Sequence, residues 1–185
     1  MIGFNVHSVE LAPEASREPL EELRRRVGFV PNLAGAMAEA PVAIDGFNQL
    51  QRALRETTLS AAEREIVGIA VSVHNRSAYS VAAHSAFGER AGLEPEVIEA
   101  LRAGKEDLPE GKAAALAAFT RAVLRSGGLV GQEEVGALLG SGYSRAQALE
   151  VVTQAAYTVM ANWVAGVTGA ELDAALSGKA WDGVV

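Results

Sequence analysis

Short helical patterns, separated by glycine and proline, fill most of the chain. Within each pattern, apolar residues recur every three or four positions, which is the spacing of one face of an α-helix. Glycine stands where many patterns end and proline where several begin, as is usual at helix termini. The patterns therefore predict an all-α bundle of roughly eight to ten helices. They cover residues 14–27, a short stretch up to 39, and residues 41–55, 60–74, 77–91, 95–103, 110–126, 132–139 and 144–164.

One of these segments, residues 60–74, fits two patterns. Its apolar residues at 67, 69, 71 and 73 alternate as in a strand, whereas those at 66, 69, 70 and 73 follow helical spacing. Ser60 and Glu63 have the spacing of a capping box, which marks the first turn of a helix and favours a helix here. A second capping box opens the segment 144–164, which is apolar almost all round. A helix of that kind is usually buried centrally or at a subunit interface.

The amino-acid composition excludes several classes of function. The chain has 185 residues, a net charge of −7, three histidines and no cysteine. The lack of cysteine excludes disulfides, thiolate metal sites and thiol nucleophiles. The acidic charge argues against nucleic acid as a partner, and we expect no metal and no cofactor. Because no apolar run is long enough to cross a membrane and the first residues do not resemble a signal peptide, we expect a cytoplasmic protein.

The length favours one domain. We expect residues 1–14 to form an N-terminal extension and residues 15–185 to form a single helical domain. The residues with the most chemical interest gather within residues 59–92, which we take as the core of that domain.

The spacing of five polar residues is the main functional signal. Glu65 stands twelve residues before Ser77, Ser80 follows three residues later, and His84 comes four residues after Ser80. Tyr79 lies between the two serines. Residues four apart on a helix share a face, so Ser80 and His84 are predicted to point to the same side, together with Ser77.

This spacing and its flanks resemble the alkylhydroperoxidase D and carboxymuconolactone decarboxylase superfamily, in particular its peroxidase-related branch. That family has a glutamate, a Cys-x-x-Cys pair and a histidine at the same intervals. Further resemblance lies in Gly28–Asn32, Met37–Pro41, Phe119–Val123, Gly142–Ser144 and Leu149–Val151. The resemblance implies an all-helical, homo-oligomeric protein, a trimer or hexamer, whose residues 60–90 and 144–164 contribute to the interface.

The resemblance also implies an activity, that of an antioxidant oxidoreductase which reduces alkyl hydroperoxides. Such enzymes attack the peroxide bond with one cysteine and close a disulfide with the other, while Glu and His relay protons. In this chain Ser77 and Ser80 occupy both cysteine positions, and a serine hydroxyl forms neither a sulfenic acid nor a disulfide. We therefore predict a protein without thiol-peroxidase turnover that keeps Glu65, Tyr79 and His84 as its remaining site residues.

A further difference from the peroxidase-related branch bears on whether the two serines are natural or engineered. The branch carries an Asn-His pair in its last long helix, and this chain has Ala165 and Gly166 there. Deliberate replacement of two cysteines would explain the serines and an inactivated peroxidase. It would not explain the loss of this pair, so natural divergence is favoured.

The residues alone are compatible with several functions. Glu65 and His84 fit an acid/base enzyme of the carboxymuconolactone decarboxylase type, a lyase acting on a small lactone or carboxylate, with Arg76 as a candidate anchor for the carboxylate. A non-catalytic oligomeric scaffold or binding protein, in which the Glu–His pair is structural, is the alternative. A Ser–His nucleophile is less favoured, since no oxyanion-hole signature or third orienting residue is visible.

Structural interpretations apply to other residues as well. Ser77 has the simplest explanation as the cap of the following helix. Tyr157 and Trp163 are interpreted as core or interface residues. The charged residues Arg24, Arg25, Arg26, Glu63 and Arg64 are interpreted as solvated helix faces.

Overall fold

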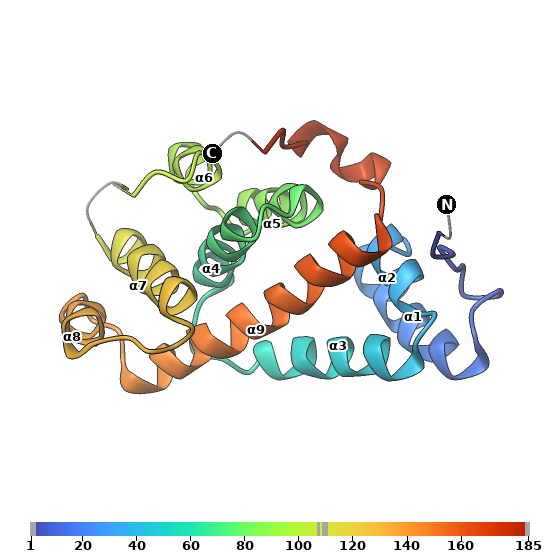
Figure 1. Cartoon of the computed structure of the whole chain (residues 1–185), viewed down its shortest axis with the longest axis horizontal. Coiled ribbons are helices and arrows are strands. Elements are labelled where there is room, and N and C mark those ends of the chain that lie inside the picture. The colour runs from blue at the N-terminus through green and yellow to red at the C-terminus, as the bar shows by residue number, and fades with distance from the viewer. Residues whose placement is uncertain (1–2, 107, 109–110, 184–185) are drawn as a thin grey trace.

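The computed structural model describes residues 3–106, 108 and 111–183, and within these residues it contains helices and no strand. The prediction of an all-α fold is confirmed (Figure 1). The elements are α1 Glu14–Val27, α2 Asn32–Met37, α3 Pro41–Leu54, α4 Ala61–His74, α5 Ala78–Arg90, α6 Pro95–Arg102, α7 Lys112–Ser126, α8 Gln132–Gly140, α9 Arg145–Thr168 and the 3-10 helix η1 Ala174–Lys179.

The helix ends follow local signals in the sequence. Both capping boxes form, because the Ser60 and Ser144 hydroxyls each accept from the backbone N–H three residues on while that residue's side chain bonds back. The ambiguous segment is therefore the helix α4. The last long helix, α9, continues to Thr168 rather than ending near residue 164, because Gly169, at φ 64°, supplies the left-handed turn that stops it. The predicted start of the helix 110–126 lies outside the described residues.

The two patterns in α4 have a common cause in its burial. Every residue from Ile66 to Val73 is buried, because α5, α7 and α9 pack around this helix. A helix enclosed on all sides carries apolar or small residues around its whole circumference, so an alternating pattern can appear within it. The first of two apolar cores surrounds α4 together with α6, α7 and the beginning of α9.

The second core lies between α1, α2 and α3 and the later half of α9. In Figure 1, α9 crosses the molecule diagonally, with α7 and α8 at one end and α1 and α2 at the other. Although its sequence is apolar almost all round, α9 is not enclosed. One face exposes large apolar side chains at Leu149, Val152, Trp163 and Val167.

The segment after α9 folds back over α5 and α6. Arg102 on α6 donates hydrogen bonds to the carbonyls of Lys179 and Ala180, and the indole N–H of Trp181 donates to the Arg102 carbonyl. This tail brings Asp173 and Leu176 next to helices from the first half of the chain. In the part of the chain that the structure describes, no helix combines the length and the apolar character needed to span a bilayer.

Candidate functional site

A glycine in α4 positions the predicted histidine. A Cβ atom added to Gly68 would lie 2.4 Å from Nδ1 of His84, which is impossibly close. The imidazole of His84, on α5, therefore rests directly on the backbone of α4. A glycine inside a helix costs about 1 kcal/mol relative to alanine, so its presence here reflects the need for close approach.

Glu65 and His84 form the hydrogen-bonded pair that the sequence suggested. Oε2 of Glu65 lies 2.7 Å from Nδ1 of His84, and the two side chains are only 18% and 10% exposed. A carboxylate at Nδ1 favours the tautomer with the proton on that nitrogen, which leaves the lone pair on Nε2. No other described residue forms a hydrogen bond with the imidazole, so Nε2 is available to a ligand.

The two serines at the cysteine positions are buried, and their hydroxyls form no hydrogen bond with a described residue. Ser77 is at the N-cap of α5, but its hydroxyl does not cap the helix, so that prediction is wrong. Both Ser77 Oγ and Ser80 Oγ lack a partner among the described residues. Ser80 lines the same pocket as His84 without bonding to it, which gives no support to a Ser–His nucleophile.

Ser77 lies apart from Glu65 and His84. Together with Tyr79 it borders a separate hollow, which includes Arg76 and the positions Ala165 and Gly166, where the resemblance implied an Asn-His pair. Arg76 is exposed there and does not lie beside Glu65 and His84. Its assignment as the anchor for a carboxylate next to that pair is therefore wrong.

Tyr79 is tied to the C-terminal tail. Its hydroxyl donates to Asp173, which also accepts from the backbone N–H of Asn32 at 2.9 Å. Burial, together with the neighbouring Asp173 carboxylate, raises the pKa of Tyr79 far above its usual value. The phenol is thus held protonated as a hydrogen-bond donor, and it fixes the tail against α5 and the start of α2.

An apolar pocket of about 100 Å³ adjoins His84 and Ser80. Phe47 of α3 and Tyr157 of α9 stack in its wall with ring centroids 4.5 Å apart. Tyr157 was interpreted as core or interface, and the structure places it in the core and at the pocket. Other walls come from α1, α5 and the tail, with Leu23, Phe29, Phe87 and Leu176.

A polar hollow of about 180 Å³ also borders His84. Glu65 and His84 line it together with three arginines, Arg26, Arg55 and Arg64. Arg26 and Arg64 are partly buried, so their interpretation as part of solvated helix faces is wrong. The pocket and the hollow meet at four residues that line both of them: Gln51, His84, Phe87 and Tyr157.

The sequence carried little sign of this hollow. Its residues come from α1, α3, α4, α5 and α9, and no short motif links them. The described residues contain no group of three or more His, Asp or Glu side chains arranged to hold a metal ion. The arrangement can support proton transfer between the Glu–His pair and a ligand. Such a ligand would lie against the arginines of the hollow and the aromatic side chains of the pocket.

Comparison with known proteins agrees with this geometry. Residues 38–123, which contain Glu65 and His84, match the sequence model of the carboxymuconolactone decarboxylase family. No curated protein sequence is significantly similar to the chain. Among solved structures, the alkylhydroperoxidase AhpD core of an uncharacterized peroxidase-related protein from Ralstonia eutropha JMP134 superimposes with a TM-score of 0.83, at 24% identity, over 98% of this chain and 96% of that one.

Two further structures share the fold. An uncharacterized peroxidase-related protein from Silicibacter sp. TM1040 has a TM-score of 0.78 and 22% identity, over 90% of this chain and 89% of that one. A Cys-to-Ala variant of the debrominase Bmp8, in complex with 2,3,4-tribromopyrrole, has a TM-score of 0.78 and 16% identity, over 97% and 95%. The predicted resemblance is thus confirmed: the chain has the AhpD-like helical fold, and its residues 38–123 match the sequence model of the carboxymuconolactone decarboxylase family.

Proposed function

We propose that Glu65 and His84 form an acid/base pair that moves protons to and from a small organic substrate, and that the protein has no thiol-peroxidase turnover. The observation that carries the proposal is the 2.7 Å contact between Glu65 and Nδ1 of His84 at the junction of two hollows. A base oriented by a carboxylate, with its second nitrogen free, has the arrangement that general-base catalysis needs.

The proton transfer can be written for a substrate with an acidic C–H next to a carbonyl. His84 Nε2 takes the proton, and the C–H electron pair becomes the C=C bond of an enolate while the carbonyl oxygen gains the negative charge. Glu65 stabilises the resulting imidazolium through Nδ1. Return of the proton to the same or another carbon regenerates neutral His84. Positioned acid/base groups of this kind contribute roughly 10²–10⁴-fold in rate.

The substrate is proposed to be small and largely apolar, with a lactone or carboxylate group. The pocket beside His84 is walled by aromatic and aliphatic side chains, which suit a ring-sized apolar body. The debrominase of the same fold binds a halogenated pyrrole, and this supports a small planar ligand here.

Deuterium exchange tests this function. The protein in D₂O is mixed with a panel of small γ-lactones with and without a carboxylate group, headed by α-angelica lactone, and NMR follows deuterium at the acidic carbon. We expect faster exchange with the wild type than with His84→Gln or Glu65→Gln. His74→Gln, which changes an exposed histidine at the end of α4, serves as the matched control. Exchange by the wild type no faster than by His84→Gln across the panel would contradict the proposal.

The absence of thiol turnover has its own test. The chain contains no cysteine, so peroxide reduction through a sulfenic acid has no starting residue. Cumene hydroperoxide and dithiothreitol are expected to react no faster with the protein than with its His84→Ala variant. Steady consumption above that variant would show that another group reduces the peroxide.

A second candidate, an oligomeric scaffold or binding protein, is favoured by one feature. The exposed apolar face of α9 is suited to packing against a second copy of the chain. We therefore propose a homo-oligomer, a trimer or hexamer, whether or not the acid/base site turns over. A cytoplasmic location, expected from the sequence, stays a prediction.

A further inference from the structure

The polar hollow beside Glu65 holds more positive than negative charge. Arg26, Arg55 and Arg64 line it, and Glu65, bonded to His84, is its one carboxylate among the described lining residues. Arg55 and Arg64 form no ion pair with any carboxylate in the described part of the chain. Arg64 instead donates to the carbonyl of Leu59 at 2.8 Å. This local excess occurs in a protein whose net charge is −7.

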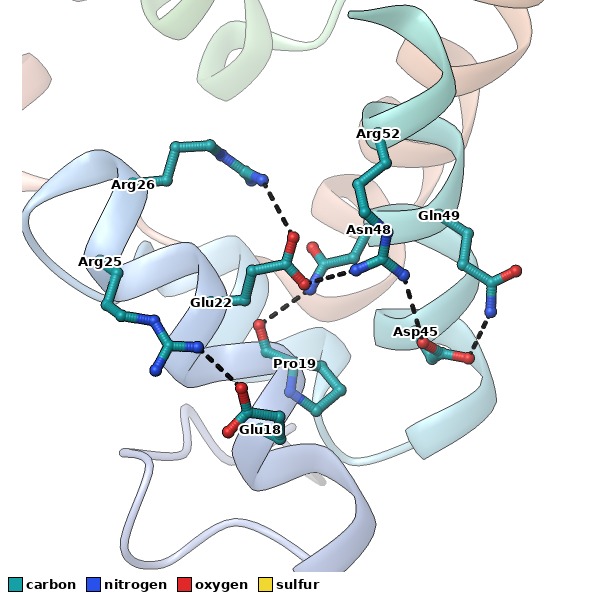
Figure 2. Close-up of polar contacts among 9 residues, drawn as sticks. All are labelled: Glu18, Pro19, Glu22, Arg25, Arg26, Asp45, Asn48, Gln49 and Arg52. Atoms are coloured by element: carbon teal, nitrogen blue, oxygen red, sulfur yellow. Dashed lines mark hydrogen bonds and ion pairs between the residues drawn. The ribbon is translucent and has the colours of Figure 1, made fainter.

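Arg26 gives the clearest indication that this hollow suits an anion. Its Nη1 and Nη2 atoms are buried and make no hydrogen bond. The nearest carboxylate, Glu22, is 3.8 Å away and already accepts a 2.6 Å hydrogen bond from Arg52, as Figure 2 shows. Burial lowers the pKa of Arg26, and the positive charges of Arg55 and Arg52 lower it further. A buried guanidinium without hydrogen-bonded partners is costly, and a bound anion would remove that cost.

Gln51 adds a second unsatisfied group at the same place. It lies at the junction of the polar hollow and the aromatic pocket. Its side-chain oxygen is buried and accepts no hydrogen bond from a described residue. Buried amide oxygens are nearly always bonded, so this one indicates a hydrogen-bond donor on whatever fills the junction.

We propose that the three arginines bind a carboxylate of the substrate, so that the ligand is a small carboxylic acid whose ring-sized apolar body occupies the aromatic pocket. This inference deepens the proposed function, since it assigns the substrate class of the same site. The carboxylate lies on the polar side of the imidazole and the apolar body on the other. The reacting carbon, which joins them, is then beside Nε2 of His84.

The chemistry of the walls favours a carboxylate over a phosphate. Arginine pairs with a carboxylate through two parallel hydrogen bonds, and Arg26 has both terminal nitrogens free for them. Glu65 shares the hollow, and its negative charge opposes a doubly charged phosphate more than a singly charged carboxylate.

Calorimetric titration of the full chain with phenylacetate tests this assignment. Phenylacetamide has the same shape without the charge, so the wild type should bind it at least tenfold more weakly. Arg26→Gln should weaken phenylacetate binding tenfold or more. Arg25→Gln should leave it unchanged, because that neighbouring arginine is exposed and paired with Glu18. If Arg26→Gln does not fold, Arg55→Gln provides the second test and should likewise weaken phenylacetate binding.

The assignment is overturned if phenylacetate and its amide bind equally, if both arginine variants bind like the wild type, or if inorganic phosphate binds more tightly than phenylacetate. Glu65→Gln separates this test from that of the proposed function. It should abolish deuterium exchange, and phenylacetate should bind at least as tightly as to the wild type, because the variant removes the one carboxylate among the described lining residues of the hollow. Exchange without phenylacetate binding would refute the carboxylate site alone, and binding without exchange would refute the acid/base function alone.

Discussion

Two serine hydroxyls are buried in α5 without a hydrogen-bond partner, at Ser77 and Ser80. A hydroxyl in that situation costs about 1–3 kcal/mol, whereas a thiol behaves as a small apolar group and tolerates it. Both positions therefore suit sulfur better than oxygen, in keeping with the cysteines that the resemblance implied at these positions.

Replacing one serine with cysteine tests this environment. Ser80→Cys is expected to raise the free energy of unfolding by about 1 kcal/mol, because it removes the penalty of the unpaired hydroxyl. Ser85→Cys is the matched control, since its buried hydroxyl donates to the Val81 carbonyl at 2.6 Å and accepts from Arg102. That variant should be less stable than the wild type. Urea unfolding measures both, and a destabilised Ser80→Cys protein would contradict the argument.

Three buried tyrosines are expected to lower the free energy of unfolding at high pH. Burial is the main cause that raises the pKa of Tyr79, Tyr143 and Tyr157 above the ordinary value of 10, aided by Asp173 at the first and Glu63 at the second. The folded state holds these protons more tightly than the unfolded chain, so the three groups stabilise it fully below about pH 10. Above that pH the unfolded chain ionises first, and the stabilisation is lost.

We therefore expect the urea midpoint to fall as the pH is raised from 9 to 11. Tyr143→Phe removes one of the three groups, and its midpoint should fall less steeply over the same range. Equal slopes for the variant and the wild type would show that Tyr143 does not contribute.

At the residue scale, the sequence predicted the hydrogen-bonded Glu–His pair but not the groups around it. Glu65 and His84 belong to one motif with a fixed spacing, so their pairing follows once α4 packs on α5. Arg26 and Gln51 have no such relation to the motif. They reach the site because α1 and α3 pack beside it, and amino-acid spacing carries no information about that contact.

At the scale of elements, the crossing of α4 and α5 depends on a glycine. His84 rests on Gly68, and a side chain at that position would force the helices apart and separate Glu65 from His84. A Cβ on Gly88 would instead displace the end of the Leu93 side chain, 2.9 Å away, and make ordinary contact with the Cβ of Glu65 at 3.6 Å. The helix boundaries were predictable from caps and glycines, but the role of Gly68 was not, because nothing in its flanks identifies the ring above it.

Gly68→Ala is expected to destabilise the protein by about 1–3 kcal/mol through overpacking and to abolish deuterium exchange. Gly46→Ala is the control, because Gly46 also lies within a helix but has no atom within 4 Å of the added Cβ. That change should stabilise α3 by up to about 1 kcal/mol. A fully active Gly68→Ala protein would show that the imidazole can shift without losing its partner.

At the scale of the whole molecule, the exposed face of α9 is the feature that the monomer leaves unexplained. Trp163 is 66% exposed and Val167 is 72% exposed, on a helix with Leu149 and Val152 on its open side. The sequence pattern predicted either central burial or an interface for this helix, and the partial burial favours the interface.

Light scattering of Trp163→Glu measures that interface. The wild type is expected to be an oligomer and the variant a smaller species, because a carboxylate replaces the largest apolar side chain on the exposed face. Val42→Glu changes an equally open apolar residue on α3 and should leave the assembly intact. A monomeric wild type would contradict the proposed oligomer.

The tail after α9 has a consequence for how relatives diverge. The proton-transfer pair lies within residues 38–123, but Asp173 and Leu176, with Leu23 and Arg26, come from outside that segment. Under the proposed function, the reacting pair lies in the middle stretch, whereas ligand recognition is shared between that stretch, with Arg55 and Arg64, and its flanks. Exchanging the flanking stretches between two proteins that share the middle one is therefore expected to alter substrate preference while leaving the reaction type in place.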